Sequence, residues 1–346
     1  MISSKRITIK EVAKQAGVST QTVSRVVNNE ARVASGTRSR VQAVIDQTGY
    51  RPNTVARALI RGHTNTIGII SSGIGFYGPS QTVTGIEHEA KRLGYNLTLG
   101  LLQDANRSTI ANAIDEMQAQ NVAGIIWAVE IDVNSEYELL RDQFRAVSVP
   151  LVAHGIQPIP NISSIRIDNY HGGCLATQHL IEQGYQRIAT ITGPLSQWSA
   201  CERLRGWRGA LKTAGLSAEN DLIASGDWTP ASGDKAIRQL LHRRPDIEAI
   251  FISNDQMAIG AMYVAAQLGR HVPHDLGIVG YDDLPISAYL SPSLTTIRQD
   301  VLSSGRLTMQ MLHQQIKTGG NRPKITAMNN DLQPKLIVRA SSQRVR

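Results

Sequence analysis

The sequence predicts a small all-α domain with a helix-turn-helix, followed by an α/β core that folds as two doubly wound parallel-sheet lobes. Three observations carry this prediction. Residues 1–62 hold 11 of the 36 Lys and Arg residues but only three of the 28 Asp and Glu residues, which leaves 25 of each for the rest of the chain. Two short amphipathic segments near the N-terminus flank a glycine. From residue 65 onward, apolar runs alternate with amphipathic segments of about ten to fifteen residues.

The overall composition restricts the class of protein. The chain has 346 residues, of which 41% are apolar and 18% are charged, as in a globular protein of two or three domains. Its two cysteines, Cys174 and Cys201, fit neither a disulfide framework nor a metal-ligand spacing. No run approaches the roughly 18 apolar residues of a membrane span. We therefore expect a cytoplasmic protein without a membrane segment, whose basic N-terminal part contacts phosphate.

The first helix is predicted to begin at Ile9. The preceding Thr8 and the following Glu11 form a capping box, in which a hydroxyl and a carboxylate satisfy backbone N–H groups at the start of the helix. Apolar residues recur at helical spacing up to Ala16, and Gly17 supplies the turn that ends the helix.

The second helix is predicted over residues 20–29, TQTVSRVVNN, with Ser19 as its N-cap. Its valines face inward and its polar residues face outward. The outward residues are Thr20, Gln21, Ser24, Arg25 and Asn28. Two short helices joined in this way form a helix-turn-helix whose second helix can lie in the major groove, where Gln recognises adenine and Arg recognises guanine. A solvated helical hairpin is the alternative, but the cap, the turn, the polar face and the local charge all favour DNA binding.

Two further helices are predicted before the α/β core. The third has Thr37, Arg38 and Arg40 near its start, placed to contact phosphate. The fourth, with Asn53 as a plausible N-cap, has only about two turns and is too short to persist alone in water. A paired copy and a DNA minor groove would stabilise it, with Leu59 as an apolar wedge between base steps. An ordinary interdomain linker is the alternative.

The remaining residues predict the α/β core and the domain boundaries. Strands that alternate with helices imply parallel sheets covered on both faces, and their number is too large for one lobe. The predicted parts are a headpiece (1–52), a hinge helix and linker (53–64) and a core (65–346), in which lobe one takes about 65–162 plus part of 296–330 and lobe two takes about 163–295 plus the C-terminal strand.

A ligand site is predicted where the strands of both lobes end, because ligands of open α/β sheets bind at the carboxyl ends of the strands. Aromatic rings can stack on the apolar face of a sugar, while carboxylates, an amide and an arginine hydrogen-bond its hydroxyls. The candidates are Phe76, Tyr77, Ser80, Asp168, Ser199, Arg203, Trp228, Asn254 and Asp282. Taken singly, a tryptophan is more often a core residue and an aspartate at a strand end is more often a helix cap.

An enzyme is the competing class, because GIGFYG after the first predicted strand matches the G-x-G-x-x-G spacing of dinucleotide-binding proteins. Bulky Phe76 and Tyr77 stand before the third glycine, however, and Pro79 suits the first position of a helix that starts later. The next strand reaches an acid only at Asp104. Neither H-E-x-x-H nor G-x-S-x-G occurs. We therefore expect no catalysis, no cofactor and no metal, and we interpret these glycines as the first loop of a ligand cleft.

The segment TIKEVAKQAGVSTQTVSRVVNN, followed by GYRPNTVARAL and the strand IGII, resembles the amino terminus of the LacI/GalR family of bacterial transcription repressors. The resemblance extends over essentially the full chain. It implies a headpiece tied by a hinge helix to a two-lobed core similar to periplasmic sugar-binding proteins. It also implies that Thr20, Gln21 and Arg25 read bases and that Leu59 is the leucine that both partners insert at the centre of a palindromic operator.

The same resemblance implies a function for the core. Arg203, Asn254 and Asp282 would bind the effector and Trp228 would stack on it, while Trp127 or Glu130 could enter the cleft from lobe one. The expected protein is a dimeric repressor of carbohydrate-utilisation genes controlled by a sugar. GPSQ, GPLS and GDW resemble the lactose-type repressors and favour a β-glycoside. The alternatives are a purine or another corepressor, and a sugar-binding protein without a regulatory role.

Overall fold

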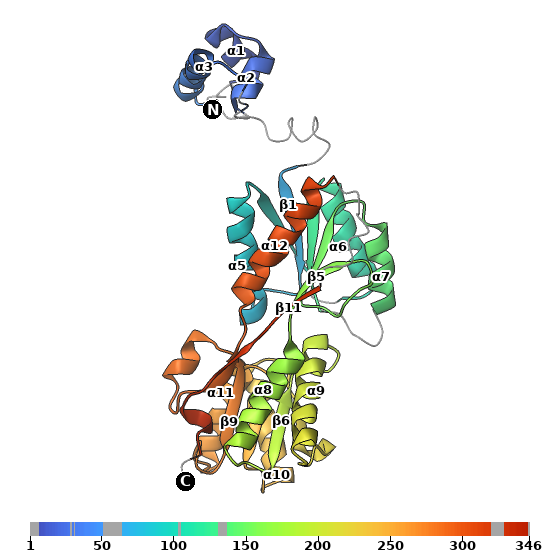
Figure 1. The fold of residues 1–346 in the computed structure, drawn as a ribbon, viewed down its shortest axis with the longest axis vertical. Helices are drawn as coiled ribbons and strands as arrows, with labels where there is room; N and C mark the ends of the chain where they lie inside the picture. Colours follow the sequence, from blue (N-terminus) through green and yellow to red (C-terminus); the bar gives the residue numbers. More distant parts are fainter. Residues whose placement is uncertain are drawn as a thin grey trace, which may run out of the picture. The chain divides into compact units, whose positions relative to one another are not determined.

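The computed structural model describes residues 7–27, 30, 32–50, 64–102, 105–130, 137–319 and 329–344. The chain divides into two units, Met1–Thr64 and Asn65–Arg346 (Figure 1). Within the described residues, none of the helices is long and apolar enough to cross a bilayer.

In its described residues, the first unit contains three helices, α1 (Ile9–Ala16), α2 (Thr20–Val27) and α3 (Ser35–Thr48). The predicted capping box is present, with the Glu11 carboxylate accepting from the Thr8 N–H at 2.7 Å. Gly17 ends α1 with a φ of 64°, a left-handed conformation that favours glycine. A small core joins the three helices. Its buried residues are Val12, Ala13, Ala16, Val23, Val26, Val41 and Tyr50.

The first lobe of the second unit contains a parallel six-stranded sheet in the order β11-β5-β4-β3-β1-β2. Its strands are β1 (Thr66–Ser71), β2 (Asn96–Leu101), β3 (Gly124–Ala128), β4 (Leu151–His154), β5 (Ser163–Ile167) and β11 (Asn329–Leu332). Its helices are α5 (Tyr77–Arg92), α6 (Arg107–Ala119), α7 (Tyr137–Ala146) and α12 (Val301–Lys317). Helices α5 and α12 cover one face of the sheet, and α6 and α7 cover the other (Figure 1).

The second lobe contains another six-stranded sheet, in the order β12-β10-β9-β8-β6-β7, in which only β12 pairs antiparallel among the described strands. Its strands are β6 (Ile188–Thr192), β7 (Ile223–Ser225), β8 (Ala249–Ile252), β9 (Gly277–Asp282), β10 (Thr295–Arg298) and β12 (Lys335–Ile337). Its helices are α8 (Asn169–Glu182), α9 (Trp198–Thr213), α10 (Pro230–Arg243) and α11 (Asp255–Gln267), with 3-10 turns η1 (Asn220–Leu222), η2 (Pro285–Tyr289) and η3 (Ala340–Ser342).

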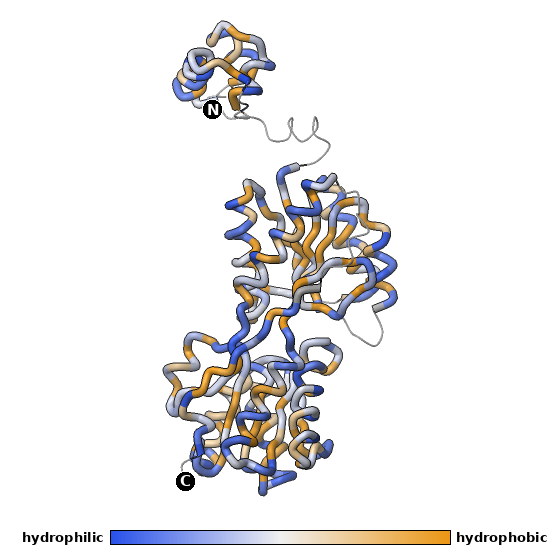
Figure 2. Tube along the Cα trace, viewed as in Figure 1, coloured by the Kyte–Doolittle hydropathy of each residue, from blue (hydrophilic) through white to orange (hydrophobic). Residues whose placement is uncertain are grey.

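Each sheet is apolar along its central strands. Figure 2 shows the hydrophobic colour concentrated on the strands and the hydrophilic colour on the outer turns of the helices. Strands β6 and β8 are buried along their whole length, as expected of parallel strands covered by helices on both faces. The predicted fold class, a helical headpiece followed by two doubly wound α/β lobes, is confirmed.

The boundary between the lobes differs from the prediction near residue 163. Strand β5 belongs to the first sheet, because Ser163 pairs with Val152 of β4 and Ser164 pairs with Asn329 of β11. The chain therefore passes to the second lobe after Ile167. It crosses again between β10 and α12 and once more between β11 and β12. An apolar run in the sequence predicts a strand but carries no information about which of two sheets that strand joins.

Helix α5 also begins earlier than predicted. Phe76 is its N-cap and Tyr77 its first residue, so Pro79 is the third residue of the helix. Proline is tolerated there because N–H groups of the first turn have no partner within the helix. Gly73 in the preceding loop has a φ of 144°, which only glycine adopts readily.

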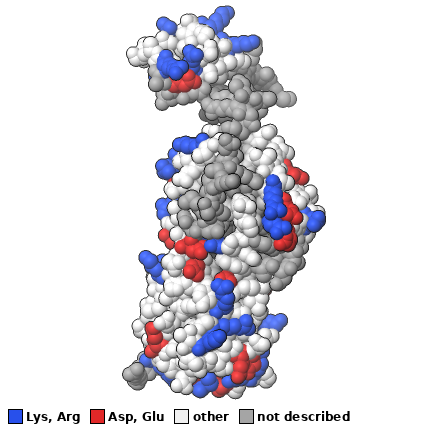
Figure 3. Space-filling model, turned by 45° about the vertical axis from the view of Figure 1, so that its right-hand side comes forward, with Lys and Arg blue, Asp and Glu red and all other residues white. Residues whose placement is uncertain are grey.

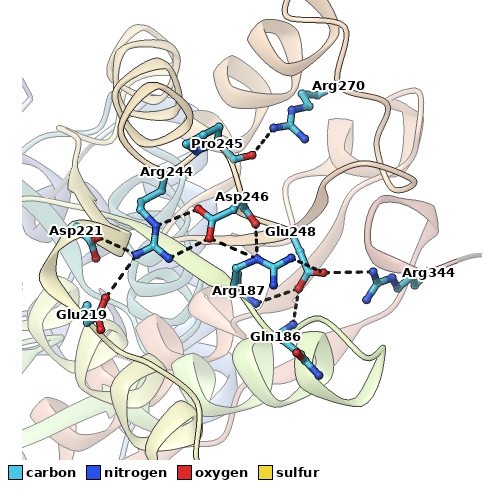
Figure 4. Close-up of polar contacts among 10 residues, drawn as sticks. All are labelled: Gln186, Arg187, Glu219, Asp221, Arg244, Pro245, Asp246, Glu248, Arg270 and Arg344. Atoms are coloured by element: carbon cyan, nitrogen blue, oxygen red, sulfur yellow. Dashed lines mark hydrogen bonds and ion pairs between the residues drawn. The ribbon is translucent and has the colours of Figure 1, made fainter.

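A network of ion pairs lies at the amino-terminal ends of β6 and β8, away from the edge where the strands end (Figure 4). Arg244 contacts Asp246 at 3.0 Å and Asp221 at 2.8 Å. Glu248 contacts Arg187 at 3.1 Å and Arg344 at 3.4 Å. The network thereby ties the C-terminal segment to the second lobe.

Candidate functional site

A cavity of about 320 Å³ lies between the two lobes, where the strands of both sheets end. The first lobe contributes the loop after β1, the first turns of α5 and the residues that follow β3 and β4. The second lobe contributes the first turns of α8, α9 and α11 and the ends of β7 and β9. Both parallel sheets thus direct their loops into one space.

Six of the nine candidate ligand residues line this cavity, and three do not. The six are Phe76, Ser199, Arg203, Trp228, Asn254 and Asp282. Asp168 instead caps α8, where its carboxylate accepts from the His171 N–H at 2.8 Å. The Ser80 hydroxyl donates to the Tyr77 carbonyl at 3.0 Å. An aspartate before a helix and a serine in its first turn have local backbone partners, which compete with a ligand for the same oxygen.

Arg203 is buried at the base of the cavity and held from three sides. Its Nε donates to the Asn169 side chain at 2.8 Å, and its Nη1 donates to the Ser253 carbonyl. Its guanidinium carbon lies 3.7 Å from the centroid of the Tyr281 ring. An arginine fixed in this way presents its remaining donors in one orientation.

Two carboxylates face Arg203 from opposite lobes. Glu130 comes from the segment after β3 and accepts from the Ser199 hydroxyl at 2.9 Å. Asp282 ends β9 and accepts from the Gln299 amide at 2.5 Å. Burial raises the pKa of Glu130 to about 7 and that of Asp282 to about 6, although the Arg203 charge opposes both shifts. Each carboxylate has acceptor capacity left for the hydroxyl groups of a ligand.

Aromatic and amide groups complete the cavity. Asn254 caps α11 by accepting from the Met257 N–H at 2.9 Å, and its amide donates to the Trp228 carbonyl at 3.0 Å. Phe76, 38% exposed, lies at the start of α5. His154 lines the cavity 3.0 Å from the Ser304 hydroxyl, and burial lowers its pKa to about 4. The imidazole of His154 is therefore expected to be uncharged at neutral pH.

Of the two alternatives for lobe one, Glu130 enters the cavity and Trp127 does not. The Trp127 indole is fully buried, donates to the Val129 carbonyl at 2.9 Å and packs edge-on against Phe144. Sequence reasoning missed several polar lining residues: Asn169, Gln197, Gln256 and Gln299. Asn169 and Gln256 lie two and four residues beyond the ends of β5 and β8, in the first turns of α8 and α11, and could have been found by searching the first helical turn. Gln299 follows a strand whose chain crosses between lobes, which no local pattern indicates.

The first unit carries the candidate nucleic-acid interface. Ser19, Thr20, Gln21 and Arg25 are exposed on or beside α2, and Ser24 is half-buried. Ser19 caps α2 by accepting from the Thr22 N–H at 3.1 Å. Thr37 is half-buried in the first turn of α3. Figure 3 shows Lys and Arg side chains at several places on the visible face of this unit. Asn28, Asn53 and Leu59 lie outside the described residues.

Comparison with known proteins places both units in one family. Residues 8–53 match the model of "Bacterial regulatory proteins, lacI family", and residues 177–342 match that of a "Periplasmic binding protein-like domain". The ribose operon repressor of Escherichia coli (strain K12) is 35% identical over 97% of this chain and 99% of its own length.

Two solved structures are similar over nearly the full length. The lac repressor dimer bound to operator and the anti-inducer ONPF is 32% identical, with a TM-score of 0.88, over 99% of this chain and 100% of that chain. A complex of the transcriptional regulator CelR with cellobiose is 32% identical, with a TM-score of 0.73, over 97% of this chain and 100% of that chain. The predicted family is thereby confirmed: the chain belongs to the lacI family of bacterial regulatory proteins.

Proposed function

We propose that this protein is a repressor of carbohydrate-utilisation genes that binds a palindromic operator as a homodimer and responds to a small sugar in the cavity between its lobes. The observation that supports this most is the convergence of an arginine, two carboxylates and two aromatic rings on one cavity. The similarity to a ribose operon repressor and to a cellobiose-bound regulator supports a sugar as the ligand class. We assign the protein no catalytic role and place it in the cytoplasm.

For DNA recognition, we assign base contacts to the exposed face of α2. Gln21 can bridge the edge of adenine and Arg25 that of guanine, while Thr20 can contact either. The contacts that position the helix on the backbone would come from Ser19, Ser24, Asn28, Thr37 and Asn53. Leu59 would be the wedge in the minor groove.

For the effector, we assign stacking to Trp228 and Phe76 and hydroxyl recognition to Arg203, Asn254 and Asp282. Glu130 and Ser199 reach each other across the cavity and would contact the same ligand from opposite lobes. A sugar has donors for the carboxylates, acceptors for the arginine and apolar C–H faces for the rings. Tyr77, Ser80 and Asp168 are not part of this assignment, because none of them lines the cavity.

Exposed apolar residues support the homodimer. Leu99 and Leu101 of the edge strand β2 are 40% and 54% exposed. In the second lobe, Tyr263 and Tyr289 are 63% and 83% exposed. Leu99 and Leu101 are two residues apart and so lie on one face of β2, and exposed apolar side chains that share a face are typical of a surface that another protein covers.

Regulation would follow from a difference in effector affinity between two arrangements of the lobes. An effector that favours the arrangement in which the hinge helices separate would withdraw Leu59 from the minor groove and weaken operator binding. An effector that favours the opposite arrangement would act as a corepressor, as a purine would in the alternative assignment.

Operator binding tests the DNA half of the proposal. Genomic footprinting should reveal a palindromic site, and Leu59→Ala should lose specific affinity for it. Unchanged affinity of that variant would remove the wedge role. A protein that binds no duplex specifically would instead be a sugar-binding protein without a regulatory role.

A thermal-shift screen with ribose, lactose, cellobiose and purine bases tests the effector half. A ligand at 100 times its dissociation constant stabilises the fold by about 2.7 kcal/mol. Arg203→Ala and Asp282→Ala should abolish the response, since each removes a polar partner of the ligand. A full response in both variants would contradict the assigned site, and a response to purine bases alone would replace the sugar assignment.

A further inference from the structure

The backbone conformation and the ring position of Trp228 are both fixed by neighbouring residues. Its φ is 74°, a left-handed conformation that a residue with a large side chain rarely adopts. The turn is fixed by the Asp227 carboxylate, which accepts from the Thr229 N–H at 3.0 Å. The indole lies over Gly193, where an added Cβ would come within 2.2 Å of the ring. Backbone strain of this kind persists only where several neighbours enforce it.

Gln197 holds the other end of the indole. Its side-chain Oε1 accepts from the Trp228 Nε1 at 2.8 Å, and both residues line the cavity. The single hydrogen-bond donor of the indole is thereby used within the protein. Trp228 can then offer a ligand only its ring, whose face favours apolar C–H groups over hydrogen-bond acceptors.

Gln197 is itself held in place by residues on both sides of it in the sequence. It stands at the N-cap position of α9, where its N–H donates to the Pro194 carbonyl at 2.9 Å. The next two residues reach the first lobe: the Arg166 guanidinium lies 5.7 Å from the centroid of the Trp198 ring, and Ser199 donates to Glu130 at 2.9 Å. The acceptor that orients Trp228 therefore belongs to a turn fixed by both lobes.

We propose that Gln197 is a positioning residue that sets ligand specificity by locking Trp228 as a stacking platform. The site then favours a ligand that presents an apolar C–H face to the Trp228 ring. It disfavours a ligand that needs a hydrogen bond from the indole N–H, because Gln197 already accepts that hydrogen bond. This inference rests on the proposed effector site for its effect on affinity. Its structural part, the contact between Gln197 and the Trp228 indole, is measurable without any ligand.

Two substitutions and one control isolate the contact. Gln197→Leu removes the acceptor at similar size, and Gln197→Glu retains an acceptor. Gln178→Leu, on the exposed face of α8 in the same lobe, serves as the control, since Gln178 contacts only Glu182 there among the described residues. The indole N–H cross-peaks of the full-length protein labelled with ¹⁵N-tryptophan report the contact, with the Trp228 peak assigned from its loss in Trp228→Phe.

The protein supplies two internal references for that spectrum. The Trp127 indole donates to the Val129 carbonyl, and the Trp207 indole is buried without a partner in the described part of the chain. In the parent and in Gln197→Glu, the Trp228 proton should exchange slowly and resonate downfield as a bonded indole does. In Gln197→Leu it should move upfield and exchange faster, while the Trp127 and Trp207 peaks stay unchanged.

Affinity provides the second measurement, using whichever of ribose, lactose and cellobiose binds the parent protein best. Gln197→Leu should bind that sugar roughly tenfold more weakly, whereas Gln197→Glu and Gln178→Leu should bind it nearly as the parent does. An unchanged Trp228 peak in Gln197→Leu, or an equal loss of affinity in Gln197→Glu, would overturn the proposal. If no sugar binds the parent, the proposed effector class fails, and the cross-peak still decides whether Gln197 positions the indole.

Discussion

At the scale of single residues, the side chain of Arg25 on α2 is available to contact DNA. It is exposed on α2, and its Nε lies 3.9 Å from the Glu30 carboxylate, which is exposed as well. Such an ion pair contributes only about 0 to 1 kcal/mol to stability. The side chain is therefore free to leave Glu30 for a base at small cost.

We predict that Arg25→Ala loses about 1 to 3 kcal/mol of binding free energy on the operator and much less on random duplex DNA, because a base contact is specific to sequence. Thermal stability should change little. Arg40→Ala, on the exposed part of α3, is the matched control and should weaken binding to both duplexes alike. Titrations of both variants on both duplexes measure the difference, and an equal loss for Arg25→Ala would make it a phosphate contact.

The carboxyl group of Glu130 makes the stability of the core depend on pH. Burial raises the pKa of its carboxyl to about 7 in the folded protein, against an ordinary value of 4.5. The folded state thus binds the proton more tightly than the unfolded state does. The resulting stability is fully present below pH 4.5 and is lost as the pH rises towards 7.

We predict that Glu130→Gln flattens the fall in the unfolding free energy of the core between pH 4.5 and 7. Each tenfold difference in acidity corresponds to about 1.4 kcal/mol, and partial exposure to the cavity reduces the total to roughly 1 to 2 kcal/mol. Denaturant titrations at several pH values measure the slope. Glu116→Gln, an exposed position on α6, should leave the slope unchanged; an equal slope in Glu130→Gln and the parent would show that the carboxyl does not titrate in this range.

At the scale of elements, pairs of helices approach through glycines. In the second lobe, α10 and α11 cross where a Cβ on Gly233 would lie 2.1 Å from the Met257 carbonyl oxygen. In the first lobe, α5 and α12 cross where a Cβ on Gly85 would lie 2.1 Å from the Leu302 carbonyl oxygen. Backbone atoms cannot yield as a flexible side chain can, so each crossing requires the absence of a side chain.

We predict that Gly233→Ala destabilises the core by about 1 to 3 kcal/mol, because the added methyl forces α10 and α11 apart. Alanine otherwise favours a helix over glycine by roughly 0.5 to 1 kcal/mol. Gly78→Ala in α5 serves as the control, since a Cβ there meets nothing within 4 Å. Thermal unfolding should show opposite shifts for the two variants; a stabilised Gly233→Ala protein would contradict the close crossing.

Local signals predicted the ends of several elements. The predictions of the capping box at Thr8 and of the turn at Gly17 are confirmed, because both features involve residues within one helical turn of each other. The start of α5 was wrong, since the Pro79 preference for early helical positions does not specify which of them it takes. The prediction of Asp168 as a ligand residue was wrong for a similar reason. An aspartate between a strand and a helix can bind a ligand or cap the helix, and the sequence does not show whether a backbone N–H group lies within reach of its carboxylate.

At the scale of the whole molecule, the alternation of strands and helices was sufficient to predict two α/β lobes, but not their boundary. Strand β5 joins the first sheet by pairing with β4 on one side, and its other side pairs with β11, which lies more than 150 residues later. The cavity residues were predicted best where an aromatic or charged residue ends a strand, as Asp282 does, or follows one within three residues, as Trp228 does. Gln197 was missed because its role depends on a partner 31 residues away.

The division into two units predicts two separate responses to ligands. The first unit has its own small core, and the second has separate cores in each lobe. Without DNA, a sugar at 100 times its dissociation constant should stabilise the core by about 2.7 kcal/mol and leave the unfolding of Met1–Thr64 unchanged. Operator DNA should stabilise the first unit, and sugar added to that complex should change its unfolding as well, because coupling between two sites is reciprocal. Scanning calorimetry of the full chain with sugar, operator and both measures these shifts. Strictly additive shifts would show that the cavity and the operator site are not coupled, and would leave the protein without the proposed switch.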